Sequence, residues 1–216
     1  MENSSCIVSV AFREPYLTHS KKQESVINGV DYLVLRDELP TKDGVMKEDI
    51  VTHFQKSLYG FKPHAIQRAI DLGYKKIVWF DPSVLPVTDV KVLFNSLDTH
   101  PMIVVLGDAP VTRMANQKSK DWFGVKDEEL DGVKHIGGTI YGFNFNNPKA
   151  LETFNLWKRA EEEGIFGNQD EFMKGHWADE ACMSLAMYKT GVEFYKEESF
   201  KYLNQKEYQE YTKLNP

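Results

Sequence analysis

The sequence lacks a surplus of basic residues and lacks any long apolar run. Its formal net charge is −6, from 26 Lys and Arg against 32 Asp and Glu, whereas domains that bind nucleic acid usually carry a basic face. No stretch reaches the ~18 apolar residues that a membrane-spanning helix needs. The apolar run at residues 6–12 is also too short for the core of a signal peptide. We therefore expect a cytoplasmic protein that neither binds nucleic acid nor spans a membrane.

Cysteine and several common catalytic motifs are also scarce or missing. The two cysteines, Cys6 and Cys182, lie in apolar stretches and are expected to be buried thiols in a reducing compartment. No Cys and His residues have the spacing of a zinc site. The chain has no Gly-x-x-x-x-Gly-Lys loop, no Gly-x-Gly-x-x-Gly after the first strand and no Gly-x-Ser-x-Gly elbow. These absences argue against the enzyme classes that depend on those motifs.

Apolar, strand-like segments alternate with helix-like segments along the 216 residues. Pro63 and Pro148 are placed to begin helices, and Gly73, Gly164 and Gly191 are placed to end them. We expect strands at 6–12, 31–37, 77–80, 102–106, 137–146 and 192–195, and helices at 63–72, 88–97, 148–163 and 179–190. This alternation predicts one Rossmann-like α/β domain, with a mostly parallel central sheet flanked by helices.

Polar residues follow four of the expected strands. These strand ends are Phe12-Arg13, Asp37, Asp81 and Asp108. In open α/β sheets ligands collect at the carboxyl ends of the strands, and three of these four ends carry a carboxylate. The sequence therefore predicts a polar, partly acidic cleft where a divalent cation and a phosphate would meet. At any one position, a plain turn residue is the alternative interpretation.

Three segments together resemble one enzyme class. Residues 74–89, YKKIVWFDPSVLPVTD, run from a buried strand through Asp81 to a helix start; LYGFKPHAIQRAIDLG precedes them, and HIGGTIYGFNFNNPKALETFNLWKRA follows. Over about residues 6–195 this order is similar to that of the GT-A glycosyltransferases, including the glycogenin-like and lipopolysaccharide galactosyltransferase-like enzymes. The carboxyl-terminal His-x-x-Gly-x-x-Lys-Pro-Trp signature of the glycogenin-like branch is absent, so the resemblance is to the class and not to one branch.

The resemblance implies a single GT-A domain over residues 1–216. It implies a nucleotide-binding half at about 1–107, an acceptor-binding half at about 108–195 and a tail at 196–216, which is expected as a docked helix. The implied reaction is transfer of a sugar from a UDP- or GDP-linked donor, with UDP favoured, to a glycan or glycoprotein acceptor. Sugar-phosphate nucleotidylyltransferases are a weaker alternative, because they carry a Gly-rich loop where this chain has Arg13-Glu14-Pro15-Tyr16.

The expected metal site departs from the family pattern. In GT-A enzymes an Asp-x-Asp motif holds Mn²⁺ or Mg²⁺, which stabilises the charge on the leaving diphosphate. Here the triplet is Asp81-Pro82-Ser83, and a serine hydroxyl is a weak neutral ligand. Either the enzyme works without a tightly held metal, or Asp81 acts with other groups such as His135, His176 or Asp108. The missing acid also supports a second hypothesis, an inactive module that binds nucleotide sugars.

The resemblance implies roles for further residues, with turn, capping or core positions as their alternatives. Either Asp179 or Glu180, at a helix start, would be the catalytic acid, which serves as general base in inverting members and lies near the anomeric carbon in retaining ones. The donor would be bound by Ala11, Phe12, Arg13, Asp37, Lys62, Asp81 and Ser83. The acceptor sugar would contact Gly137, Gly138, Thr139 and Trp177.

Overall fold

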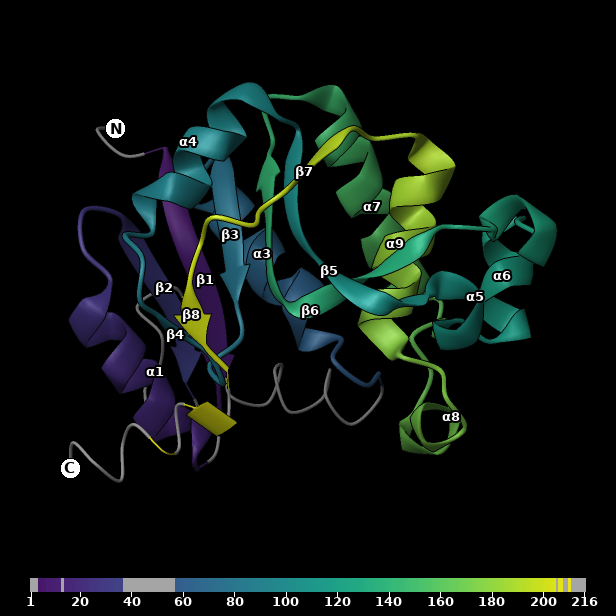
Figure 1. Cartoon of the computed structure of the whole chain (residues 1–216), viewed down its shortest axis with the longest axis horizontal. Helices are drawn as coiled ribbons and strands as arrows, with labels where there is room; N and C mark the ends of the chain where they lie inside the picture. Colours follow the sequence, from purple (N-terminus) through teal and green to yellow (C-terminus); the bar gives the residue numbers. More distant parts are fainter. Residues whose placement is uncertain (1–3, 13, 37–56, 205, 208–209, 211–216) are drawn as a thin grey trace.

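A six-stranded sheet forms the centre of the computed structural model, which describes residues 4–12, 14–36, 57–204, 206, 207 and 210 (Figure 1). The strand order is β2-β1-β3-β6-β5-β7. Within this sheet β6 is antiparallel to its neighbours β3 and β5, whereas the pairs β1–β2, β1–β3 and β5–β7 are parallel. The mostly parallel sheet expected from the sequence is therefore confirmed. The strands are β1 Ser5–Ala11, β2 Asp31–Arg36, β3 Lys76–Phe80, β5 Met102–Pro110, β6 Lys134–Asn144 and β7 Phe194–Lys196.

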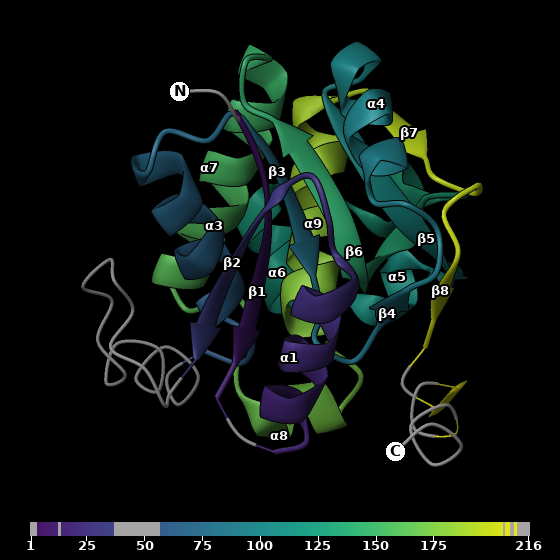
Figure 2. The same ribbon diagram turned by 90° about the vertical axis from the view of Figure 1, so that its left-hand side faces the viewer.

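Helices cover both faces of this sheet and bury two apolar cores. Figure 2 shows α3 and α7 on one side of the sheet and α4 on the other. Strand β3 serves both cores, because alternate side chains of a strand point to opposite faces: Trp79 belongs to the core of α3, α7 and α9, and Val78 to that of α4. The helices are α1 Tyr16–Val26, α3 Phe61–Asp71, α4 Lys91–Thr99, α5 Val111–Met114, α6 Gln117–Phe123, α7 Pro148–Glu162, α8 Gln169–Met173 and α9 Ala178–Thr190, with a 3₁₀ turn at Asp127–Leu130.

The helix ends follow the local signals in the sequence. The side chain of Asn147 accepts a hydrogen bond from the N–H of Lys149, and Pro148 begins α7. Helix α9 ends at Gly191, whose φ of +62° is the left-handed conformation that glycine adopts without strain. These two helices pack closely on each other and on β6. They form the wall against which the candidate site is built.

Three segments differ from the expectation. Strand β5 continues to Pro110 through register shifts instead of ending near 106, so Asp108 lies exposed within a strand and not at its carboxyl end. Helix α1 was not expected, because its sequence YLTHSKKQESV has little apolar periodicity. The tail, expected as a docked helix, is helical at residues 206, 207 and 210, but it first forms β8 Tyr202–Leu203, which pairs with β4 Leu85–Pro86.

Two other expectations concern cysteine and membranes. Cys6 and Cys182 are both buried free thiols, as predicted. In the described part of the chain, the structure contains no helix with the length and apolarity required to cross a membrane.

Candidate active site

A cavity of about 110 Å³ lies where α3, α9, β6 and the end of β3 meet. It combines carboxylates, one lysine and an aromatic wall. All but two of its residues were singled out from the sequence; the exceptions are Tyr59 and Phe172. The cavity is lined by Tyr59, Lys62, Asp81, Gly138, Thr139, Phe172, Trp177, Asp179 and Glu180.

The floor of the cavity is a buried ion pair. Lys62, in the first turn of α3, donates to Oδ2 of Asp179 at 2.6 Å and to the carbonyl of Gly138 at 3.1 Å. Both charged side chains are only 3% exposed. Burial lowers the pKa of Lys62, but the nearby Asp179, Asp81 and Glu180 outweigh it and raise the pKa overall. Burial raises the pKa of Asp179, and the Lys62 ammonium opposes that rise. Lys62 is therefore a fixed positive charge among three acids.

Glu180 follows Asp179 on α9 and points about 100° away around the helix. Burial and the adjacent Asp179 raise the pKa of Glu180 to about 7, against the opposing effect of Lys62 and a backbone hydrogen bond from Gly138. A Cβ at Gly138 would lie 2.5 Å from Oε1 of Glu180 and 2.9 Å from Nζ of Lys62, so a larger residue would displace these two side chains. The side chain of Glu180 remains 18% exposed, so it can both reach the cavity and exchange a proton near neutral pH.

Asp81 is held at the carboxyl end of β3 by hydrogen bonds through its N–H, its carbonyl and its side chain. Its N–H donates to the carbonyl of Thr139 at 2.8 Å. Its own carbonyl accepts from the side-chain amide of Gln23 at 2.8 Å, so the unexpected helix α1 fixes this loop. Its Oδ1 accepts from the N–H of Ser83 at 2.8 Å. Ser83 therefore contributes a backbone N–H that orients the acid.

The described residues around Asp81 do not by themselves make up a preformed metal centre. Mn²⁺ and Mg²⁺ take oxygen ligands in sets of about six, and one oxygen of Asp81 is already engaged by Ser83. Across the placed residues, no three His, Cys, Asp or Glu side chains come together as a metal site.

Aromatic side chains form the remaining wall of the cavity. Trp177 is 39% exposed and lies 6.0 Å, between ring centroids, from Phe172. Tyr59 lies 6.3 Å from Phe172 and lies beneath the Lys62 ammonium. Tyr59 and Ala178 both have a positive φ, of 64° and 32°, and such backbone strain clusters at functional sites.

No protein-family model matches the chain, and no curated protein sequence matches it significantly. The structure is similar to that of mouse xyloside xylosyltransferase 1 in its apo form, with a TM-score of 0.54, 10% identity, and coverage of 89% of this chain and 84% of that chain. A protein of Desulfovibrio desulfuricans G20, provisionally assigned as a nucleotide-diphospho-sugar transferase, gives a TM-score of 0.48 at 13% identity, over 90% and 80% of the two chains.

This chain has a GT-A-like fold. The fold expected from the sequence is thus confirmed. At 10% identity the similarity extends to the fold alone, so the chemistry has to follow from the side chains of this chain.

Several residues that the sequence assigned to the donor do not line the cavity. Ala11 is buried in β1, and Phe12 packs edge-on against Phe61 with ring centroids 5.6 Å apart. Gly137, which the sequence assigned to the acceptor, precedes Gly138 in β6 and does not line the cavity either. The predicted donor residues Arg13 and Asp37 lie outside the described residues.

Two of the three residues proposed to help Asp81 hold a metal, His176 and Asp108, do not line the cavity. His176 is buried, its Nδ1 accepts from the N–H of Asn116 at 3.3 Å, and its Nε2 donates to the carbonyl of Ile165 at 3.1 Å. Burial lowers the pKa of His176, so this ring is a neutral connector between loops. Asp108 is exposed on β5. His135 lies beside one of the cavity acids, since its Nε2 is 3.7 Å from Oε2 of Glu180.

Sequence reasoning missed Tyr59 and Phe172. Tyr59 stands at the break before α3, and the Tyr59-Gly60 break was visible in the sequence without any sign that the ring faces the acids. Phe172 lies in the short helix α8, for which the sequence has no apolar periodicity. Both reach the cavity through contacts between distant segments.

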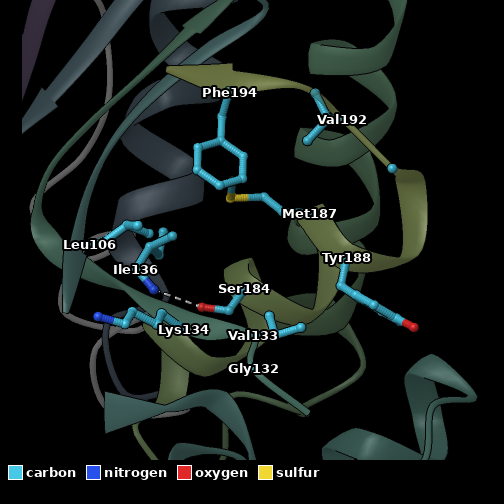
Figure 3. Close-up of a pocket in the computed structure, with 11 residues that line it drawn as sticks. Leu106, Gly132, Val133, Lys134, Ile136, Ser184, Met187, Tyr188, Val192 and Phe194 are labelled. Atoms are coloured by element: carbon cyan, nitrogen blue, oxygen red, sulfur yellow. Dashed lines mark hydrogen bonds between the residues drawn. The ribbon is translucent and has the colours of Figure 1, made fainter. Parts of the chain in front are cut away.

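A second, larger cavity of about 620 Å³ lies between the carboxyl-terminal half of α9 and strands β5 to β7. Figure 3 shows Phe194 and Met187 pointing toward each other across it. The hydroxyl of Ser184 accepts from the N–H of Ile136 at 3.0 Å and donates to the carbonyl of Glu180 at 2.7 Å. This lining is mostly apolar and contains no carboxylate, so the acidic cavity is the candidate active site.

Proposed function

We propose that this protein is a glycosyltransferase. It moves a sugar from a nucleoside-diphosphate donor, with UDP favoured over GDP, to a hydroxyl group of a glycan or protein-linked acceptor. The observation that carries the proposal is the set of Lys62, Asp81, Asp179 and Glu180 around one cavity, within a GT-A-like fold. The cavity is smaller than the ~300–1,000 Å³ of typical whole-ligand pockets, so it would hold the reacting sugars and not the whole donor.

Glu180 is the proposed proton acceptor. In the net reaction the acceptor oxygen bonds to the anomeric carbon, the bond from that carbon to the diphosphate oxygen breaks, and the diphosphate leaves with the bonding electrons. The acceptor hydroxyl must lose its proton. A carboxylate whose pKa is raised to about 7 is well matched to that task, because general bases work best when their pKa is near the working pH.

We propose that Lys62 and Asp179 hold Glu180 in place and fix the charges around it. Their pair is fully buried, so neither group is free to exchange protons with the acceptor. Fixed charges in a water-poor site stabilise charge that develops in a transition state. Here the three acids would stabilise the positive charge that builds on the donor sugar ring, and Lys62 would keep Asp179 ionised.

The two ends of the cavity suggest where each substrate binds. Asp81 is proposed to accept hydrogen bonds from hydroxyl groups of the donor, since it lines the cavity from the carboxyl edge of β3. The half-exposed ring of Trp177, with Phe172 and Tyr59, is proposed to pack on the apolar face of the acceptor sugar. Because the described residues do not by themselves make up a metal centre, this mechanism contains no metal step.

A panel of UDP- and GDP-linked sugars with glycan and peptide acceptors tests the proposal. We expect release of nucleoside diphosphate together with a glycosylated product. Asp81→Asn should abolish it, whereas Asp108→Asn, a matched acid outside the cavity, should leave it unchanged. Full activity of the Asp81 variant would remove our assignment of the donor site.

Binding without turnover would favour the second candidate, an inactive nucleotide-sugar-binding module, which the serine at position 83 supports. A thermal-shift measurement with UDP and GDP separates binding from catalysis. A ligand at 100 times its Kd stabilises the folded state by about 2.7 kcal/mol. We expect a shift with UDP that does not require added Mn²⁺, because Asp81 lacks a partner carboxylate at position 83. A shift only in the presence of Mn²⁺ would contradict this expectation.

A further inference from the structure

His135 approaches Glu180 from strand β6, and the hydrogen bond of its other nitrogen fixes its tautomer. Nδ1 lies 3.0 Å from the carbonyl oxygen of Ala109. A carbonyl oxygen only accepts, so Nδ1 carries the hydrogen and Nε2 of the neutral ring presents a lone pair. That Nε2 lies 3.7 Å from Oε2 of Glu180. Catalytic hydrogen bonds are often this long before substrate binds.

The His135 ring is held in this orientation from two sides. It packs over Gly107 so closely that a Cβ at position 107 would overlap the ring. Trp177 meets it edge-on, with ring centroids 6.0 Å apart. The side chain of His135 is only 7% exposed. A buried imidazole with a fixed tautomer and its free nitrogen toward an acid is suited to receive a proton from that acid.

We propose that His135 is the proton-accepting partner of Glu180. The proposal rests on the proposed function for its use in catalysis, but the pairing itself does not. The O–H bond of the acceptor breaks and its proton binds Oε2 of Glu180; the proton then moves to Nε2 of His135, which leaves a carboxylate and an imidazolium. The imidazolium returns the proton to water after the product leaves. His135 acts on the acceptor only through Glu180, so we class it as a positioning residue and Glu180 as the catalytic one.

The charges around the pair favour this transfer. Glu180 faces Asp179 on its own helix, Lys62 from α3, Asp81 from the end of β3 and His135 from β6. Among these described groups the three acids outnumber the one lysine, so a proton that enters the cluster meets a surplus of negative charge. A proton that enters this cluster is thus shared between two adjacent sites and need not remain on the carboxyl group.

Nuclear magnetic resonance of the full chain with ¹⁵N-labelled histidine tests the pairing without any substrate. Among the pH-dependent changes of the His135 ring nitrogen signals, which are identified by their loss in His135→Phe, one inflection near pH 7 should report the ionisation of Glu180. This inflection should vanish in Glu180→Gln and remain in the control His100→Phe, whose ring packs on Tyr195 away from the cavity. An unchanged His135 titration in Glu180→Gln would overturn the proposal.

A second variant moves the ring without removing it. Gly107→Ala should push the imidazole away from Glu180 and abolish the same inflection.

In the transferase assay, His135→Phe should lower kcat about 10-fold or more with little change in KM, because binding is intact and proton removal is slowed. If His135→Phe transfers sugar with an unchanged kcat, His135 does not accept the proton from Glu180 during catalysis. If no donor is turned over, the proposed function fails while the resonance titration still decides the pairing.

Discussion

Replacing Glu180 by Gln should stabilise the protein at alkaline pH and have little effect in acid. In the unfolded chain this carboxyl group has its ordinary pKa of 4.5, and in the folded protein burial and Asp179 raise it to about 7. The folded state therefore binds the proton more tightly. The stabilising contribution of the protonated group is fully present below pH 4.5, and it is lost as the pH rises through 7.

The size of the effect follows from the two pKa values. One pH unit corresponds to 1.36 kcal/mol, so keeping an ionised Glu180 in the folded state costs about 3 kcal/mol once both states have lost the proton. Between pH 5 and pH 8 the cost grows by roughly 2–3 kcal/mol. The Gln side chain has nearly the same shape, its amide oxygen can still accept from Gly138, and it does not titrate.

Urea unfolding of wild type and Glu180→Gln at pH 5 and pH 8 measures this cost. The difference in free energy of unfolding between the two proteins should widen by roughly 2–3 kcal/mol at pH 8, which corresponds to about 5–10 °C in Tm for a chain of this length. Glu193→Gln, at an exposed position, should show no such change. An equal difference at both pH values would refute the reasoning, because it would mean that folding leaves the proton affinity of Glu180 unaltered.

Three further predictions concern the same cluster. The value of kcat/KM should rise with pH along a limb centred near pH 7, because only ionised Glu180 accepts a proton; a limb below pH 5.5 would contradict its role as base. Gly138→Ala should lower kcat/KM about 100-fold with a native circular dichroism spectrum, because a Cβ would displace Glu180 and Lys62, whereas Gly137→Ala should be milder. Lys62→Met should reduce the free energy of unfolding by about 3–5 kcal/mol, because it leaves Asp179 buried and unpaired; adding Asp179→Asn should recover much of this loss in urea unfolding. A cost below about 1 kcal/mol for the single variant would show that the pair is not desolvated.

Local patterns in the sequence determined the order of most elements and the positions of the acids. The alternation of apolar segments predicted six strands. Glycine and proline marked the ends of α3, α7 and α9, because these residues restrict the backbone whatever surrounds them. Asp81 was predicted at a strand end and Asp179 with Glu180 at a helix start for the same local reason, and each is found there.

Contacts between distant segments decided what these residues do. Lys62 and Asp179 are 117 residues apart in the chain, and nothing near either one shows that they form a buried ion pair. The same holds for Tyr59, which precedes α3, for Phe172 in α8, and for the approach of His135 to Glu180. Helix α1 lacks an apolar stripe and is stabilised instead through Gln23, which binds two carbonyls of the loop after β3. Burial, and with it the proton affinity of Glu180, is a property of the packed molecule, because it depends on which segments exclude water from the side chain.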